Sequence, residues 1–103
     1  MRDFYCDEAV SGRTPVERVL ETSAVLAFKH TRPHWAHHVV VIPKRHIASL
    51  LDPDLDEGLL RELIDVMRSV AAEMDSVHGG CHIVTNLGKY QESQHLHFQI
   101  GAD

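Results

Sequence analysis

The chain has 103 residues, of which 44% are hydrophobic and 24% are charged, and its formal net charge is −5. This length is sufficient for one domain with its own apolar core, so we expect residues 1–103 to form a single domain. The acidic balance argues against a nucleic-acid partner, which would require a basic stripe on the surface. A small anionic substrate remains compatible with the composition, because local dipoles can bind a phosphate.

The cysteines and the N-terminal segment indicate a compartment. Cys6 and Cys81 form neither a C-x-x-C pair nor a dense framework, which is usual in reducing surroundings. The first ten residues are acidic and mixed, unlike a signal peptide, and no apolar run approaches membrane-spanning length. We therefore expect a cytoplasmic protein that does not use a membrane as partner.

Three strands are predicted in the first half of the chain. A turn at residues 11–15 precedes a short extended stretch at residues 16–22. Residues 24–30 are apolar and strand-like until Pro33 breaks the run. Residues 37–43 form a β-branched run that ends at a proline, which predicts an interior strand.

A long helix is predicted from about residue 56 to residue 76. Asp54 and Asp56 are candidate N-caps, and Gly79-Gly80 closes the helix. The expected apolar stripe consists of Leu60, Leu63, Ile64, Met67, Val70, Ala71 and Met74. Further apolar residues widen it beyond what one sheet face needs: Leu59, Val66 and Val77. This width predicts a homodimer, because a broad apolar face is often an interface.

Two more strands are predicted at residues 81–86 and 94–100. The order of strands, one helix and then strands is typical of an α+β fold. We expect an antiparallel sheet of about five strands with one long helix packed on it.

The final strand carries the most unusual pattern of the chain, QHLHFQI. A period of two places His95, His97 and Gln99 on one face and the apolar residues between them on the other. A single histidine in a strand is usually a satisfied polar neighbour. Two histidines in register with an amide require polar partners or a ligand, because an unpaired imidazole is costly to bury.

Two chemistries fit this face. A His-x-His pair can bind a metal ion, but it then needs a third ligand, from His37 or His38, because Gln99 is a poor zinc ligand. Alternatively, a neutral imidazole nitrogen can attack phosphorus and hold the transferred group as a phosphoramidate. That reaction needs an acceptor that orients the other ring nitrogen, and donors around the phosphate oxygens.

The chain resembles the histidine-triad (HIT) family over essentially its whole length. HLHFQIG matches the motif His-φ-His-φ-His-φ-φ, except that Gln99 replaces the third histidine. Upstream, LAFKHTRPHWAHHVVVIPKRHI at residues 26–47 is similar to the signature block of the family. The resemblance implies a HIT-like fold, no cofactor, and a nucleotide conjugate as the small-molecule substrate. The implied activity is that of a hydrolase or nucleotidyltransferase acting on the α-phosphate.

The resemblance also implies roles for the catalytic residues. His97 would be the nucleophile that carries the nucleotidyl group, His95 would orient it, and His38 would complete the histidine set. Gln91 and Gln99 would form hydrogen bonds to phosphate oxygens. Asn86 falls where the family has an asparagine that contacts the nucleotide.

The implied nucleoside pocket departs from the family in part. Phe28 and an aromatic residue of the Phe4-Tyr5 pair would wall the base, against which aromatic stacking tolerates any base. His30 occupies the position where family members commonly have an acidic residue that binds the ribose hydroxyl groups. Glu92 follows Gln91, the glutamine before the triad, where family members often have a serine, and the charge of Glu92 would repel phosphate if it faced inward.

Gln99 is the departure with the largest chemical consequence. A glutamine amide cannot deliver a proton to a leaving group, whereas a third histidine can. Gln99 therefore suits a leaving group that departs as a stable anion. The His-x-His-x-Gln pattern resembles the uridylyltransferase and dinucleoside-polyphosphate phosphorylase branches, so transfer and phosphorolysis stand beside hydrolysis. Together the departures also motivate an alternative, a nucleotide-binding module without turnover.

Overall fold

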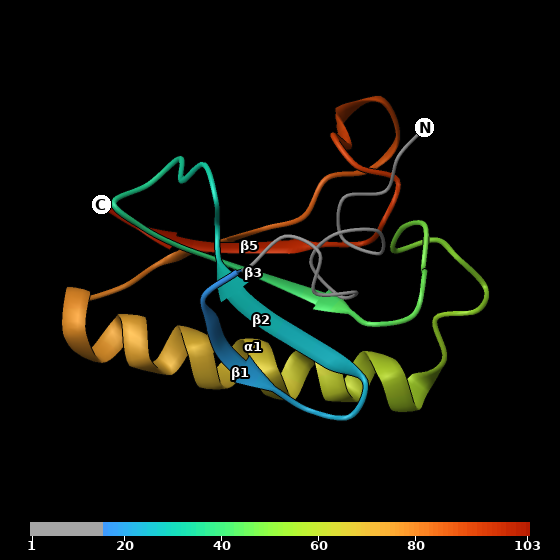
Figure 1. The fold of residues 1–103 in the computed structure, drawn as a ribbon, viewed down its shortest axis with the longest axis horizontal. Coiled ribbons are helices and arrows are strands. Elements are labelled where there is room, and N and C mark those ends of the chain that lie inside the picture. Colours follow the sequence, from blue (N-terminus) through green and yellow to red (C-terminus); the bar gives the residue numbers. More distant parts are fainter. Residues whose placement is uncertain (1–15) are drawn as a thin grey trace.

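A computed structural model describes residues 16–103 of the chain. Figure 1 shows the elements, which are β1 (Arg18–Glu21), β2 (Val25–Lys29), β3 (His37–Pro43), α1 (Glu57–His78), β4 (His82–Val84), the short 3-10 helix η2 (Gly88–Tyr90) and β5 (Phe98–Ala102). The strands form one five-stranded sheet in the order β1-β2-β3-β5-β4, and every neighbouring pair is antiparallel. The predicted α+β architecture is therefore confirmed.

The central strand β3 has the bounds that its β-branched run predicts. Its register places Val40 between Phe28 of β2 and Gln99 of β5, and it places His38 opposite Gly101. Because side chains alternate along a strand, Phe28, Val40, Gln99 and His38 share one face of the sheet. The helix α1 packs on the opposite face, and we call the face with these four residues the open face because α1 does not cover it.

The last strand begins later than predicted. The ladder with β3 starts at Phe98 instead of at residue 94. Pro43 ends β3 and has no N–H group to extend the pairing, so the chain before Phe98 finds another partner. The amide N–H of Leu96 donates to the carbonyl oxygen of Ile47, at 2.6 Å. The alternation of faces is nevertheless kept, because Leu96 and Phe98 both pack in the core beneath the helix.

The ends of α1 agree with the sequence to within two residues. Of the two candidate N-caps, Asp56 is the one that caps: its Oδ1 atom accepts the amide N–H of Leu59 at 2.8 Å. At the other end, Gly79 adopts a left-handed conformation (φ 83°), and its N–H donates to the carbonyl oxygen of Asp75 at 2.9 Å. An L side chain is strained in that conformation, which is why glycine ends the helix.

The buried face of α1 is rotated relative to the predicted stripe. Its buried residues are Leu59, Leu63, Val66, Met67, Val70 and Met74. The stripe was wrong in including Leu60 and Ile64, which are 37% and 42% exposed. The buried set spans an arc of about 100° around the helix, with Val66 at one edge and Met67 at the other. These residues pack on the side chains of β2, β3 and β5 that face the helix.

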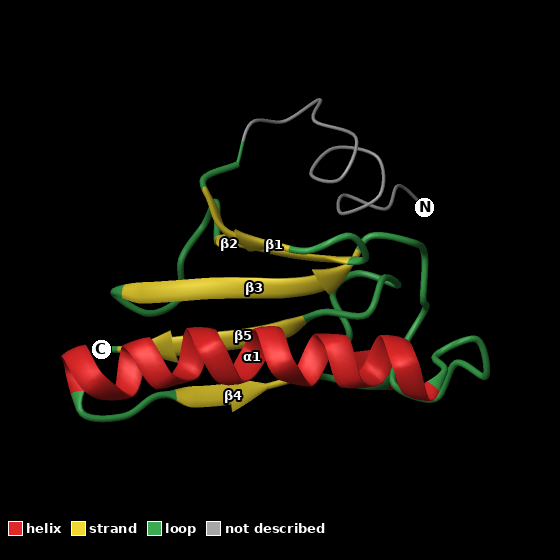
Figure 2. Ribbon diagram, turned by 90° about the horizontal axis from the view of Figure 1, so that it is seen from below, coloured by secondary structure: helices red, strands yellow, loops and turns green. Residues whose placement is uncertain are grey.

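A second, smaller apolar cluster lies on the other face of the sheet. It consists of Leu26, Phe28, Val40 and Ile42, with Val16 packed against it. Figure 2 shows that α1 covers only one face of the sheet. The open face therefore combines an apolar floor on β2 and β3 with the polar residues of β5. No helix in residues 16–103 is long and apolar enough to cross a membrane.

Candidate functional site

The ring of His95 connects the bend before β5 to the end of β3. The side chain is fully buried, and its Nε2 atom lies 2.8 Å from the carbonyl oxygen of Pro43. A carbonyl oxygen only accepts, so Nε2 carries the proton of this hydrogen bond. The ring of His46, which lies after β3, approaches His95 edge to face with ring centroids 5.3 Å apart. His95 is thus held in place from the end of β3.

His97 is oriented by the backbone of its own segment. Its Nδ1 atom lies 2.9 Å from the carbonyl oxygen of His95, and the residue is only 5% exposed. Because the carbonyl can only accept, Nδ1 carries the proton, and in the neutral ring the lone pair lies on Nε2. The hydroxyl of Thr85 donates to the carbonyl oxygen of His97 at 2.8 Å, which ties this segment to the end of β4.

His38 lies at the start of β3, next to Gln99. The backbone N–H of His34 donates to its Nδ1 atom at 2.9 Å, and the ring stacks on that of His30 with centroids 4.4 Å apart. Burial lowers the pKa of His38, and so does the nearby charge of His30, whereas the contact with Gln99 opposes the shift. His38 is therefore a neutral ring near neutral pH. The candidate site consists of His38, Gln99, His97 and His95 along one face of the sheet.

His30 occupies the position expected to contact a ribose. The backbone N–H of Arg32 donates to its Nδ1 atom at 2.9 Å, which leaves the proton of the neutral ring on Nε2. Burial lowers the pKa of His30, and the charge of Glu92 raises it. His30 can thus offer a hydrogen-bond donor, whereas a carboxylate at this position would offer only acceptors. Glu92 itself is exposed but close enough to act on this ring.

Residues between β4 and β5 that were predicted to bind a nucleotide lie close to contacts within the protein. Gln91 is buried, and its amide nitrogen donates to the carbonyl oxygen of Ala48, so it ties η2 to the segment after β3. Asn86 is half-buried and directly follows Thr85, the residue that contacts the backbone of His97. Their predicted contacts with a nucleotide remain predictions.

The predicted base pocket is only partly described. Phe28 is 1% exposed and belongs to the apolar floor of the open face, one strand away from Val40. Phe4 and Tyr5 lie outside the described residues. Phe28 therefore has the position of a floor residue, and its contact with a base stays a prediction.

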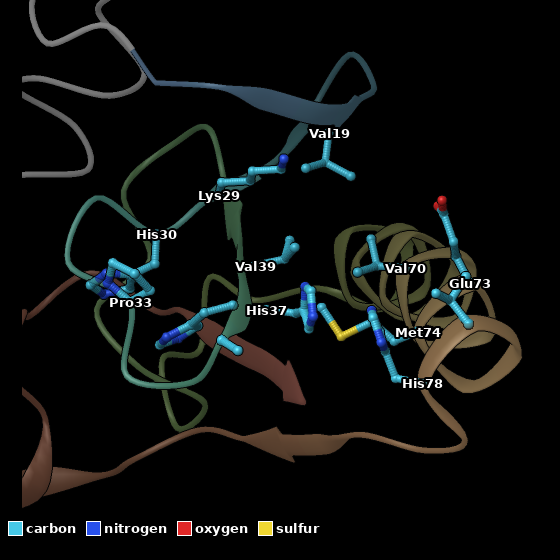
Figure 3. Close-up of a pocket in the computed structure, with 13 residues that line it drawn as sticks. Val19, Lys29, His30, Pro33, His37, Val39, Val70, Glu73, Met74 and His78 are labelled. Carbon is cyan, nitrogen blue, oxygen red and sulfur yellow. The ribbon is translucent and has the colours of Figure 1, made fainter. Parts of the chain in front are cut away.

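A cavity of about 340 Å³ opens at the end of the sheet, where the loop between β2 and β3 meets the last turns of α1 (Figure 3). Most of its walls are helix-side residues such as Val39, Val70 and Met74. It reaches the site described above only through His30 and His38. Because neither His97 nor Gln99 lines it, we place the candidate phosphoryl site on the open face and not in this cavity.

One ring nitrogen of each histidine in the predicted His-x-His pair donates to a backbone carbonyl oxygen, so in the neutral ring the lone pair lies on the other nitrogen. Nε2 of His95 and Nδ1 of His97 both face backbone carbonyl oxygens. Within residues 16–103, no group of three or more histidine, cysteine, aspartate or glutamate side chains is arranged to hold a metal ion. The third protein ligand that the metal-site alternative needs is therefore not found among these residues.

Several residues of the site were not predicted from the sequence. Trp35 contacts His38 with ring centroids 4.8 Å apart, and Thr85, His34 and His46 make the contacts described above. Trp35 is the only tryptophan in the chain and lies within the signature block, which could have drawn attention to it. The contact of His34 is made by its backbone N–H, so the residue type at this position does not reveal it.

The chain is similar to known proteins over most of its length. The family model of the HIT domain matches residues 11–100. An uncharacterized HIT-like protein of Borreliella burgdorferi is 32% identical over 104 residues, which span 97% of this chain and 75% of that protein.

Solved structures are similar over the same length. A HIT family hydrolase from Legionella pneumophila is 29% identical with a TM-score of 0.85, covering 98% of this chain and 92% of that chain. A histidine triad protein from Clostridium difficile is 32% identical with a TM-score of 0.84, covering 100% of this chain and 91% of that chain. The family model, the relative and the shared fold lead to one conclusion: this chain belongs to the histidine-triad (HIT) family.

Proposed function

We propose that the protein is a nucleotide hydrolase or nucleotidyltransferase that acts on the α-phosphate of a nucleotide conjugate through a covalent intermediate on His97. The observation that carries the proposal is the hydrogen bond from Nδ1 of His97 to the carbonyl oxygen of His95. It puts the lone pair of the neutral ring on Nε2, the atom that would attack. Membership of a family that includes proteins described as hydrolases supports the same reading.

The reaction divides into two displacements. In the first, Nε2 of His97 forms a bond to the α-phosphorus, and the bond from phosphorus to the leaving group breaks with the electron pair leaving on that group. In the second, water or another acceptor attacks the phosphorus, the P–N bond breaks with its electron pair returning to Nε2, and a proton of the attacking water passes to solvent, which restores His97. His95 orients the nucleophile through its own carbonyl group, and Gln99 serves the phosphate oxygens as a hydrogen-bond donor.

The absence of a third histidine in the motif restricts the leaving group. Gln99 has no proton to give up, so a departing group must be stable as an anion. Nucleoside polyphosphates and nucleotide sugars meet this condition, because phosphate leaves as an anion. Amine-linked nucleotides meet it poorly.

Trapping of the intermediate tests the proposal. The protein is incubated with α-³²P-labelled nucleoside triphosphates, nucleotide sugars and phosphoramidates and quenched in alkali, where a phosphoramidate survives. We expect label on the wild type and on His37→Ala, the matched control from the other face of β3, and none on His97→Ala. Product formation that persists in His97→Ala would overturn the mechanism. Binding of nucleotide without product or label would favour the module without turnover, which Glu92 beside His30 motivates.

We also propose that the protein forms a homodimer. Large apolar side chains remain exposed on α1 and on the edge strand β4, namely Leu60, Ile64, Val77 and Ile83. Burying such residues between two copies would be favourable. Light scattering at micromolar concentration should give twice the chain mass, and a monomer would contradict the proposal.

A further inference from the structure

The loop between β2 and β3 surrounds the ring of His38 on three sides. His30 stacks on one face of the ring at 4.4 Å and an angle of 27°, and Trp35 contacts it edge-on at 4.8 Å and 62°. The backbone N–H of His34 donates to Nδ1 at 2.9 Å. His38 is left 5% exposed, so its environment is set by the loop and not by water.

The hydrogen bond from His34 determines which nitrogen of His38 carries the proton. A backbone N–H can only donate, so Nδ1 is the acceptor and the proton of the neutral ring lies on Nε2. A second proton on Nδ1 would break this bond. Burial and the charge of His30 lower the pKa of the same ring, so the geometry and the charges both favour the neutral form.

The Nε2–H group of His38 in turn needs an acceptor. Nε2 is buried, and within residues 16–103 it has no well-aligned hydrogen bond. Gln99 lies beside it, opposite Val40 in the next row of the sheet, and this contact raises the pKa of His38 as an acceptor oxygen would. A buried donor without an acceptor is costly, so the Oε1 atom of Gln99 belongs on the His38 side. The NH₂ group of the same amide is then left as the donor for a phosphate oxygen.

Trp35 keeps the loop in this position because β5 has a glycine below it. A methyl group at Gly101 would overlap the indole ring of Trp35, so no other residue leaves room for this contact. On its far side the indole stacks on His82 of β4 at 5.6 Å and 17°. Trp35 therefore spans from β3 to β4 across Gly101, and it directly follows His34, whose amide donates to the His38 ring.

We propose that Trp35 is a positioning residue: seated on Gly101, it holds the proton of His38 on Nε2 and so turns the Gln99 amide to face the phosphoryl group as a hydrogen-bond donor. This inference rests on the proposed function for its catalytic consequence. Its structural part, the proton on His38, does not depend on turnover. The consequence is a site that can stabilise charge on a phosphate oxygen through Gln99 but cannot exchange a proton there.

The first test measures the proton directly in ¹⁵N-labelled protein. A through-hydrogen-bond ¹⁵N–¹⁵N coupling should connect the His34 amide to Nδ1 of His38, and Nε2 should carry the proton. The coupling should vanish in Trp35→Ala and return in Trp35→Phe, which restores a planar ring. A proton on Nδ1 in the wild type, or a coupling that survives in Trp35→Ala, would overturn the proposal whether or not the protein turns over any nucleotide.

The second test asks whether Trp35 acts through Gln99. Trp35→Ala should lower kcat/KM about tenfold, the effect of one hydrogen bond to a charged group. In a Gln99→Met background the same substitution should change kcat/KM by less than about twofold, because the two residues act as a unit. Additive effects would mean that Trp35 serves only stability and would overturn its role as a positioning residue.

Glycine substitutions provide the matched control. Gly101→Ala should reproduce the kinetic defect of Trp35→Ala, because the new methyl group displaces the indole. Gly58→Ala, where the added methyl group meets only Asp56 at an ordinary 3.5 Å, should leave kcat/KM unchanged. Unchanged kinetics in Gly101→Ala, with the protein folded, would contradict the seat that we assign to Trp35.

Discussion

His37 and His38 are neighbours in the chain, yet they face opposite sides of β3 and live in different surroundings. His37 is exposed and stacks on His78 at the end of α1, with ring centroids 3.8 Å apart and planes 21° from parallel (Figure 3). His38 is buried and stacks on His30 in a similar way. Ring stacking is thus common to both and does not distinguish a site from a surface.

The difference lies in the proton. The backbone N–H of His34 donates to Nδ1 of His38, and the backbone N–H of Arg32 donates to Nδ1 of His30. In both neutral rings the proton therefore lies on Nε2. Among the described residues, no backbone N–H donates to the ring of His37. On the open face of the sheet the backbone therefore fixes the tautomer of the neutral His38 and His30 rings, whereas on the helix side His37 has only its stacking contact with His78. The same contrast between faces extends along β5, where Ile100 is core and Gln99 belongs to the site.

The largest effect should come from the helix face. Ile100→Ala removes a fully buried side chain, and we expect a loss of about 2–5 kcal/mol in the free energy of unfolding, measured by urea denaturation. Ile83 is its partner on β4 and is 56% exposed in the single chain, so Ile83→Ala should cost at most about 0.5 kcal/mol in dilute solution, where the proposed homodimer dissociates. A large loss at Ile83 that grows with protein concentration would show that this edge is covered in a homodimer.

The open face should respond in chemistry instead of stability. Gln99→His should increase kcat/KM toward nucleotides with basic leaving groups by about a hundredfold, because general-acid assistance becomes available. It should change little for phosphate leaving groups. The measurement is kcat/KM for both proteins over nucleotides that differ only in leaving-group pKa, where the wild type should show the steeper dependence. Equal slopes would leave Gln99 without a role in choosing the leaving group.

The two neighbouring histidines offer the most direct test of the contrast. His38→Ala should lower kcat/KM about tenfold, since the Gln99 amide loses the partner that orients it. His37→Ala should leave kcat/KM within about twofold of the wild type, as expected of a surface group. Similar losses in both variants would mean that the stacked pair near α1 takes part in the reaction.

The smallest effect should appear in the pH dependence of stability. Burial lowers the pKa of His38 and of His30 in the folded state, so the unfolded chain takes up protons first as the pH falls through about 6.5. The free energy of unfolding should therefore be highest above this pH and decrease below it. Urea denaturation at several pH values should give a shallower decrease for His38→Gln than for the wild type. The slope of His37→Gln serves as the reference for a surface histidine.

The fold could be predicted further than the site. Local signals set β3, from its β-branched run, and the ends of α1, from Asp56 and Gly79. The start of β5 could not be predicted, because it depends on where Pro43 ends the pairing partner. The buried face of α1 was likewise predicted in a rotated position, because apolar residues lie on both sides of it and only packing decides whether Leu59 or Leu60 is buried.

Within the candidate site, the resemblance to the family predicted His95, His97, Gln99 and His38 together, and the sheet register brings Gln99 and His38 to one face. The motif could not predict the backbone groups that hold the rings, because any residue at position 43 supplies the same carbonyl oxygen and any residue except proline at position 34 supplies the same N–H. The contacts of Trp35 could not be predicted for a related reason: the ring packs on Gly101, a residue 66 positions away in the chain.

The bond from His95 to the carbonyl oxygen of Pro43 has a consequence for how this protein could evolve. The ring joins the segment before β5 to the end of β3, so it contributes to folding whether or not any nucleotide is turned over. A descendant released from catalysis could exchange His97 for many residues, while His95 would still be retained for the architecture. The two histidines of one motif would then diverge at different rates, and a lineage that keeps the first but loses the second would mark the point at which chemistry was abandoned.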